Sequence, residues 1–246
     1  EFCMISKSLD KLNIKIFADG ADIKTFELLY KEPLIKGFTT NPTLMRNQGI
    51  DNYETFARDV LYLVKDKPVS FEIFADDSDS IIKQAKFISS WSSNVYVKIP
   101  VTNTHGDFLG SAIKSLSDAG IKLNITAVFT SDQVSNIVSN LNKNTPAVIS
   151  IFSGRIADSG IDPINHFKDC KEKIKNRSNI QFLWASPREL FNIYNAEEAG
   201  ADIITVSQDL INKFKNIGKD LNLFSKETVQ MFYNDAKAAK YNLNIN

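Results

Sequence analysis

Short apolar runs alternate along the whole chain with longer segments whose apolar residues recur at helical spacing. The short runs are rich in β-branched and aromatic residues, which is typical of buried strands. Eight such runs are predicted as strands: Lys15 to Asp19, Gly37 to Asn41, Val69 to Ala75, Val95 to Val101, Lys122 to Phe129, Ala147 to Phe152, Gln181 to Ser186 and Asp202 to Ser207.

Amphipathic helices are predicted between these strands. From Asp22 to Lys31, and again from Ser131 to Leu141, apolar residues recur three and four positions apart. A further helix is predicted at residues 225–241, beyond the eighth strand. We expect it to cover the main fold or to dock on a neighbouring subunit.

Eight strand-then-helix units in series indicate an α/β protein with a parallel sheet. Right-handed crossovers would close that sheet into a single (β/α)8 TIM barrel over residues 1–246, for which about 250 residues is the usual length. The alternative is an open doubly wound sheet, but no G-x-G-x-x-G follows the first strand to support a dinucleotide site. We interpret residues 1–3 as a cloning remnant ahead of Met4.

Composition excludes few functions but does narrow the class of partner. The 29 basic and 29 acidic residues balance, so no nucleic-acid or acidic-membrane partner is indicated. No apolar run approaches the ~20 residues of a membrane span and no export leader is visible, so we expect a cytoplasmic protein. Two cysteines and two histidines are too few to indicate a zinc site.

Polar or ionisable residues stand at or near the carboxyl end of seven of the eight predicted strands. Strands buried on both faces are expected to be almost wholly apolar, and barrel active sites lie at this end of the strands. We therefore predict one site there, built from Asp19, Asn41, Glu72, Lys98, Asn124, Thr126, Ser150, Ser186, and two arginines just past the last two strands concerned, Arg155 and Arg188.

Each of these residues also has a purely structural interpretation. Asp19 can cap the next helix, Asn41 before Pro42 can form a turn, and Glu72 can be the ion-pair partner of Lys98. The Lys98 stem can also carry its ammonium to solvent at a strand end. It is the convergence of so many polar residues on one barrel face that favours a functional site.

The predicted set permits a specific chemistry. A buried amine with two carboxylic acids can form a Schiff base with a ketone, and the iminium then accepts electrons from a neighbouring carbon–carbon bond as that bond breaks. Burial disfavours the charged form of Lys98, whereas the carboxylates favour it. The two arginines fit a phosphate, so the predicted ligand is a sugar phosphate, with no metal and no cofactor.

The same residues carry a family resemblance. The segments "IFADGADI", "GFTTNPTLM", "VSFEIFAD", "YVKIPVT", "LNITAVFT", "ISIFSGRIAD", "WASPREL" and "GADIITVS" resemble the successive strand motifs of the transaldolase family, which includes the fructose-6-phosphate aldolases. The resemblance covers nearly the whole chain. It implies a metal-free class I (β/α)8 barrel, active in carbohydrate metabolism such as the pentose phosphate pathway.

The resemblance also implies roles for individual residues. Lys98 would form the Schiff base, Asp19 would take the proton from the hydroxyl being cleaved, and Glu72 would move protons through a water that Thr126 also holds. The residues implied to bind the sugar hydroxyls are Asn41, Asn124 and Ser150, and those implied to bind the phosphate are Arg155, Ser186 and Arg188.

Two positions indicate the branch of the family. Glu72 stands where the aldolase branch has glutamine, and Phe152 stands where that branch has tyrosine, so the resemblance implies a transferase that moves a dihydroxyacetone unit between a ketose phosphate and an aldose phosphate. Gly20 and Ile151 depart from the family pattern, which has threonine or serine and proline at these positions. We expect a homo-oligomer.

Alternatives remain open. The chain can be an aldolase that cleaves and forms fructose 6-phosphate, or a sugar-phosphate-binding barrel without turnover. A glycosidase that uses Asp19 and Glu72 as its carboxylate pair would leave Lys98 unexplained. His105 and the acidic run Asp76 to Asp79 are interpreted as surface features, and Trp184 is expected to face the barrel interior.

Overall fold

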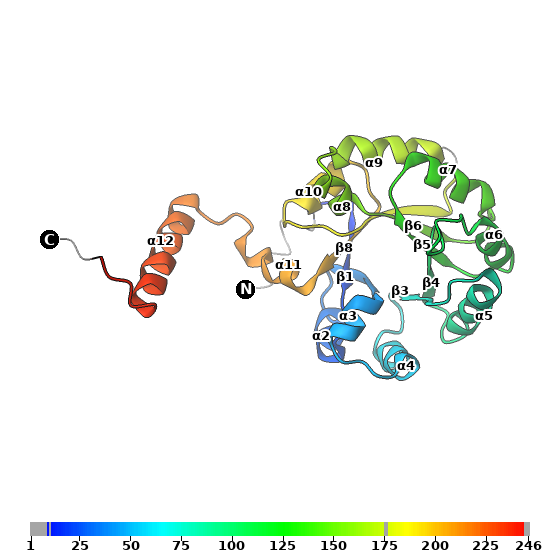
Figure 1. Cartoon of the computed structure of the whole chain (residues 1–246), viewed down its shortest axis with the longest axis horizontal. Coiled ribbons are helices and arrows are strands. Elements are labelled where there is room, and N and C mark those ends of the chain that lie inside the picture. The colour runs from blue at the N-terminus through cyan, green and yellow to red at the C-terminus, as the bar shows by residue number, and fades with distance from the viewer. Residues whose placement is uncertain (1–8, 10, 175–176, 244–246) are drawn as a thin grey trace.

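The computed structural model of the chain describes residues 9, 11–174 and 177–243. Eight parallel strands form a closed barrel in chain order, with β1 paired to both β2 and β8 (Figure 1). The strands are β1 (Lys15–Asp19), β2 (Ile35–Thr39), β3 (Val69–Glu72), β4 (Val95–Pro100), β5 (Leu123–Val128), β6 (Ala147–Ile151), β7 (Ile180–Trp184) and β8 (Ile203–Ser207). The predicted (β/α)8 barrel is confirmed, while residues 1–3 lie outside the described part.

Helices surround the barrel and cover its outer face (Figure 1). The helices before the last are α2 (Ile23–Tyr30), α3 (Pro42–Asn47), α4 (Tyr53–Leu63), α5 (Ser78–Ser89), α6 (Gly110–Asp118), α7 (Ser131–Asn140), α8 (Ser153–Asp158), α9 (Pro163–Lys171), η1 (Glu172–Ile174), α10 (Asn192–Glu198), α11 (Gln208–Asn212) and η2 (Phe214–Asn216). The last helix, α12 (Leu221–Ala238), is not part of this layer. No helix in the described ranges is long and apolar enough to cross a membrane.

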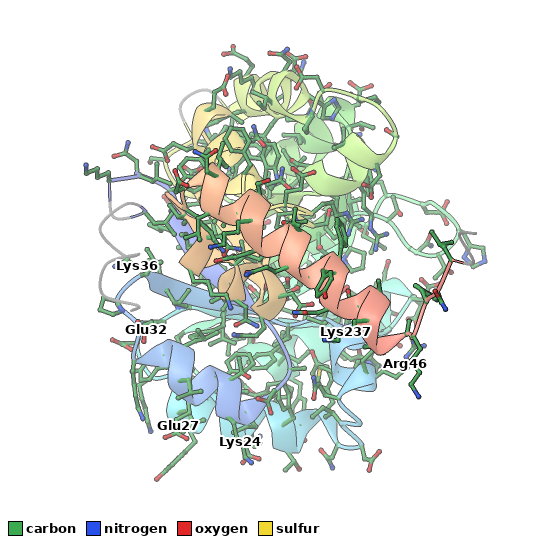
Figure 2. The ribbon with its side chains drawn as sticks, turned by 90° about the vertical axis from the view of Figure 1, so that its left-hand side faces the viewer. Lys24, Glu27, Glu32, Lys36, Arg46 and Lys237 are labelled. Atoms are coloured by element: carbon green, nitrogen blue, oxygen red, sulfur yellow. The ribbon has the colours of Figure 1, made fainter. Side chains whose placement is uncertain are left out.

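Helix α2 illustrates how the sequence pattern produces a barrel helix. Phe26 and Leu29 are buried against the strands, and the Phe26 ring centroid lies 4.8 Å from that of Phe38. Lys24 and Glu27 lie on the outer, exposed side (Figure 2). Burial of a side chain of this size contributes about 1.5–3 kcal/mol, so the apolar face holds the helix to the barrel.

The barrel interior follows the alternation of side chains along each strand. Phe17, Leu183 and Ile203 pack against one another inside the barrel. An added Cβ at Gly37 would lie 2.5 Å from the Phe17 ring, so only glycine fits at position 37. Because Leu183 and Ala185 point inward, the Trp184 between them points outward, where its ring stacks on Phe167 at 5.5 Å. The expectation that Trp184 faces the interior is therefore wrong.

Both ends of β2 differ from the prediction, because the strand runs from Ile35 to Thr39 rather than from Gly37 to Asn41. The strand stops early because Asn41 caps α3, with its Oδ1 accepting from the Leu44 amide at 2.9 Å, and Pro42 opens that helix. Asn41 therefore reaches the carboxyl end of the barrel from a helix cap, not from a strand.

The last helix, α12, stands apart from the barrel (Figure 1). None of its 18 residues is buried, and Val229, Phe232 and Tyr233, which share one face, are 63%, 63% and 66% exposed. The view along the long axis places the helix in front of the barrel, with Lys237 in its last turn (Figure 2). The extra C-terminal helix is confirmed, although it begins at Leu221, earlier than predicted.

Candidate active site

Strand register brings the predicted chemical groups together. Glu72 on β3 is paired with Lys98 on β4, and Lys98 is paired in turn with Asn124 on β5. Since residues in register on parallel strands direct their side chains to the same face, all three point into the barrel. A cavity of about 420 Å³ opens at the carboxyl ends of the strands, and the predicted residues among those that line it are Asp19, Asn41, Glu72, Lys98, Thr126, Ser150, Phe152, Arg155 and Ser186.

Lys98 lies at the wall of this cavity and is only 8% exposed. Its Nζ donates to the main-chain oxygen of Thr40 at 3.0 Å and lies 3.4 Å from Oε2 of Glu72. The amine therefore does not reach bulk solvent, and the interpretation of Lys98 as a lysine whose stem extends into water is wrong. Its ion pair with Glu72 agrees with both the structural and the functional interpretation of that carboxylate.

Asp19 faces Lys98 from the end of β1. Thr39 Oγ1 donates to Asp19 Oδ1 at 2.8 Å, and Asn41 Nδ2 donates to Asp19 Oδ2 at 3.2 Å. Burial raises the pKa of Asp19 above its ordinary value, while the Lys98 charge and these two hydrogen bonds act in the opposite direction. Asp22, not Asp19, caps α2, so the side chain of Asp19 is left for the cavity.

We expect the Thr39→Val variant to lose activity at a higher pH than the wild type. The hydrogen bond from Thr39 lowers the pKa of Asp19, so its removal raises that pKa further, and the carboxylate becomes protonated earlier as pH falls. The measurement is kcat/KM against pH, in which the acid limb shifts upward. Thr39→Ser, which keeps the hydroxyl, is the matched control, and an unmoved acid limb in Thr39→Val contradicts the assignment.

Thr39 and Thr205, two of the threonines that line the cavity, were missed in the sequence. Their hydroxyl oxygens are 2.5 Å apart. Because Thr39 donates to Asp19, Thr205 must donate to Thr39, so a chain of two hydroxyls leads to the carboxylate. Thr205 is on β8, the one strand without a predicted site residue. The available signal was a threonine within an apolar strand, "DIITVS".

The polar residues of β5 and β6 form a second group. Asn124 is buried beneath the cavity lining, where its Oδ1 accepts from Ser150 Oγ at 2.6 Å and its Nδ2 lies 3.1 Å from Ser70 Oγ. Thr126 lines the cavity, and its buried hydroxyl has no hydrogen-bond partner in the described part of the chain. A buried hydroxyl without a partner is costly, so this group is available to a water or a ligand.

The predicted phosphate site is only partly assembled. Arg155 and Ser186 line the cavity, and Ser186 Oγ accepts from the Arg155 amide at 3.1 Å. Arg188 does not line it. Its guanidinium instead makes an ion pair with Asp158, with Nη2 2.6 Å from Oδ2. The sequence predicted that Arg188 is near this end, but not that a carboxylate of α8 holds it.

Tyr53 supports the site from outside the cavity. Its hydroxyl donates to the main-chain oxygen of Glu72 at 2.6 Å, and its ring contacts Phe74 and Trp91. Burial, with a smaller contribution from the Glu72 charge, raises the pKa of the Tyr53 hydroxyl well above its ordinary value. This tyrosine therefore stays a hydrogen-bond donor that fixes the end of β3.

The minor polar features are structural. Asp77 caps α5 by accepting from the Ser80 amide, and Asp76 accepts two hydrogen bonds from Thr104. His105 is exposed and does not line the cavity. Across residues 9, 11–174 and 177–243, no group of three or more histidine, cysteine or acidic side chains is placed to hold a metal ion.

The fold and this cavity define a (β/α)8 barrel that holds a buried amine between carboxylates at the carboxyl ends of its strands. Residues 16–245 match the model of the Transaldolase/Fructose-6-phosphate aldolase family, and the chain belongs to that family. Membership gives the chain an aldolase-type function.

Curated relatives agree with this membership. The probable transaldolase 2 of Listeria monocytogenes is 31% identical over 201 residues, which are 81% of this chain and 88% of that protein. The probable transaldolase of Lactiplantibacillus plantarum is 33% identical over the same shares of each chain. A solved structure from Coccidioides immitis, described as a putative dihydrodipicolinate synthase family protein, has a TM-score of 0.60 at 12% identity. It covers 96% of this chain and 81% of its own, and it supports the fold alone.

Proposed function

We propose that this chain is a transaldolase that transfers a dihydroxyacetone unit from a ketose phosphate to an aldose phosphate through a Schiff base on Lys98. The observation that carries the proposal is the position of the Lys98 amine: it is buried, 3.4 Å from Glu72, in the cavity that Asp19 also lines. A desolvated amine beside proton-transfer groups is the arrangement that imine chemistry needs.

The proposed reaction cleaves the donor sugar and then runs the same steps in reverse on the acceptor, with Lys98 as the nucleophile and Asp19 as the proton carrier. The neutral Lys98 amine adds to the ketone carbon, and loss of water gives the iminium. Asp19 takes the proton of the hydroxyl next to the scissile carbon–carbon bond. The carbon–carbon bond then breaks, its electron pair enters the iminium to give an enamine, and an aldehyde leaves. The enamine carbon then attacks the acceptor aldehyde, Asp19 returns the proton, and water hydrolyses the new iminium to release the product.

Imine formation and hydrolysis need a proton carrier and a water. Glu72 pairs with the amine, and the Thr126 hydroxyl lacks a partner in the same cavity. We assign Glu72 as the group that moves protons to and from this water, which Thr126 helps to hold. Asn41 and Ser150 line the cavity as hydrogen-bonding groups for the sugar hydroxyls, and Asn124 acts from beneath through Ser150.

Transfer is proposed over simple cleavage because of the residue at position 152. Phe152 lines the cavity with an apolar ring and supplies no hydroxyl to protonate the enamine. Without that proton source the three-carbon enamine persists until an aldehyde arrives. The phosphate of either sugar would lie at the Arg155 and Ser186 end of the cavity.

Borohydride trapping tests this function. Fructose 6-phosphate with borohydride should leave a stable adduct on Lys98, located by peptide mass spectrometry. Erythrose 4-phosphate should increase product formation strongly, because it accepts the enamine. Release of free dihydroxyacetone at equal rates with and without the acceptor would instead favour an aldolase. Tight sugar-phosphate binding without any adduct would favour a binding protein.

We further infer that the chain assembles with copies of itself through α12. A helix in water draws most of its stability from packing of an apolar face, yet no residue of α12 is buried. The barrel also exposes aromatic side chains, with Tyr62 75% and Phe74 67% exposed. Each copy thus carries both an apolar helix face and exposed aromatic side chains, so a second copy is the occupant that fits both.

We expect the double variant Phe232→Ser with Tyr233→Ser to have a lower oligomeric state than the wild type. The two rings form the centre of the exposed apolar face, and their loss removes the area that an interface would bury. Light scattering coupled to gel filtration measures the mass. Gln230→Ser with Asn234→Ser, on the opposite face, is the matched control. A wild type that is already monomeric contradicts the inference.

A further inference from the structure

The two arginines predicted to bind phosphate differ in their partners over the ranges that the structure describes: Arg188 is ion-paired with a carboxylate, and Arg155 is not. Arg188 donates from Nε at 3.1 Å and from Nη2 at 2.6 Å to one oxygen of Asp158. Arg155 instead places its guanidinium 5.5 Å from the Phe152 ring and has no recorded ion pair among the described residues. Of the two guanidinium charges, one is therefore neutralised by a carboxylate and the other is left for a ligand.

The position of Asp158 is not explained by its helix. It is the last residue of α8, and a carboxylate is disfavoured at a helix C-terminus, where the backbone dipole is negative. Asp158 lies three residues after Arg155, so both side chains emerge from the same side of α8. The carboxylate thus lies beside the Arg155 and Ser186 end of the cavity without lining it, where its charge would repel an incoming dianion and where it occupies the Arg188 guanidinium.

The backbone around this ion pair is tightly held. Ser186 is in the left-handed region with φ of 54°, and an added Cβ at Gly154 would lie 1.5 Å from its main-chain oxygen, so α8 and the loop after β7 are in direct contact. The amides of Arg188 and Glu189 both donate to Asn192 Oδ1. A ligand can therefore redirect Arg188 by moving its side chain alone, and both side chains are about half exposed and free to move.

We propose that Asp158 is a positioning residue that sets the preference for phosphorylated over unphosphorylated substrates by competing with the substrate phosphate for Arg188. The proposal rests on the proposed function. While Arg188 is ion-paired with Asp158, a sugar that binds without a phosphate leaves only one of the two guanidinium groups, that of Arg155, without a carboxylate partner in the described structure. A phosphorylated sugar must displace a carboxylate from Arg188, so part of the affinity that two arginines would give is lost.

The Asp158→Asn variant tests the proposal. Inorganic phosphate, used as a competitive inhibitor and in calorimetric titration, should bind about three- to tenfold more tightly, because a half-exposed charge-assisted pair is modest in strength. The KM ratio of erythrose to erythrose 4-phosphate should rise by a similar factor. Glu189→Gln removes an equal charge next to Arg188 but leaves the ion pair between Arg188 and Asp158 intact, and should leave both values unchanged.

A double-variant cycle isolates the pair. In an Arg188→Ala background, Asp158→Asn should change phosphate affinity less than about twofold, since the group it releases is gone. Weaker or unchanged phosphate binding in the single variant overturns the proposal, because Asp158 would then orient Arg188 for phosphate or play no part. Borohydride trapping on Lys98 with dihydroxyacetone, which carries no phosphate, is measured in the same variants. Loss of trapping would show that the Schiff-base function fails, whereas unchanged trapping with unchanged phosphate affinity would show that only the role of Asp158 fails.

Discussion

Replacing Lys98 by arginine should abolish adduct formation and reduce turnover by about 10⁴-fold or more, the scale seen when a nucleophile is removed from an enzyme. Arginine keeps the positive charge beside Glu72 but stays protonated, so it cannot form an imine. The variant thus separates the nucleophile from the ion pair. Single-turnover trapping with fructose 6-phosphate and a coupled turnover assay measure the two losses.

Lys122 offers a matched control. Burial lowers the pKa of Lys122, and its amine contacts the Ser93 main-chain oxygen and lies 5.1 Å from the Tyr96 ring centroid, outside the residues that line the cavity. Lys122→Arg should therefore trap substrate as the wild type does. Residual trapping in Lys98→Arg at the wild-type rate would place the Schiff base on another lysine and end the proposal.

The barrel and the end at which its cavity opens could be predicted because the short apolar runs, the amphipathic segments between them and their order are properties of the sequence itself. Once the eight strands are assumed, register brings Glu72 beside Lys98, and it does so in the structure. Asp19 and Asn41 were predicted from their place at the ends of apolar runs, and they are hydrogen-bonded to each other at 3.2 Å. Local periodicity and barrel closure are sufficient for this part of the site.

Three features could not be predicted because they depend on which partner a side chain finds. Arg188 is held by Asp158, 30 residues away, and nothing in either local sequence indicates that contact. Asn124 lies beneath the cavity because Ser150 and Ser70 bind it there. Thr205 was passed over because threonine is common in strands, and its role depends on a hydroxyl contact across the barrel with Thr39.

The three charges of the site also constrain one another. Lys98 lies 3.4 Å from Glu72 and close enough to Asp19 for its charge to lower the pKa of that carboxyl, whereas burial raises the same pKa. In the proposed reaction, the iminium on Lys98 would keep a positive charge, so the attraction to both carboxylates would persist at that stage. In the neutral enamine of the same proposed reaction that attraction would be lost, and Asp19 would then hold the proton that it later returns. Charge balance therefore favours Asp19 as the group that protonates and deprotonates the sugar.

The Asp19→Asn variant should separate the two halves of this chemistry. Carbon–carbon cleavage should slow by about 10²- to 10⁴-fold, because an amide cannot take the proton, whereas adduct formation on Lys98 should persist. Dihydroxyacetone, which needs no cleavage to form the imine, is the probe for trapping, and fructose 6-phosphate is the probe for cleavage. The ratio of the two rates measures the role of Asp19 directly.

Asp22→Asn is the control for this variant, because Asp22 caps α2 only three residues away and asparagine caps a helix about as well. It should leave both rates unchanged. If Asp19→Asn instead lost trapping and cleavage together, Asp19 would be needed to form the imine, and its assignment to the cleavage step alone would be wrong.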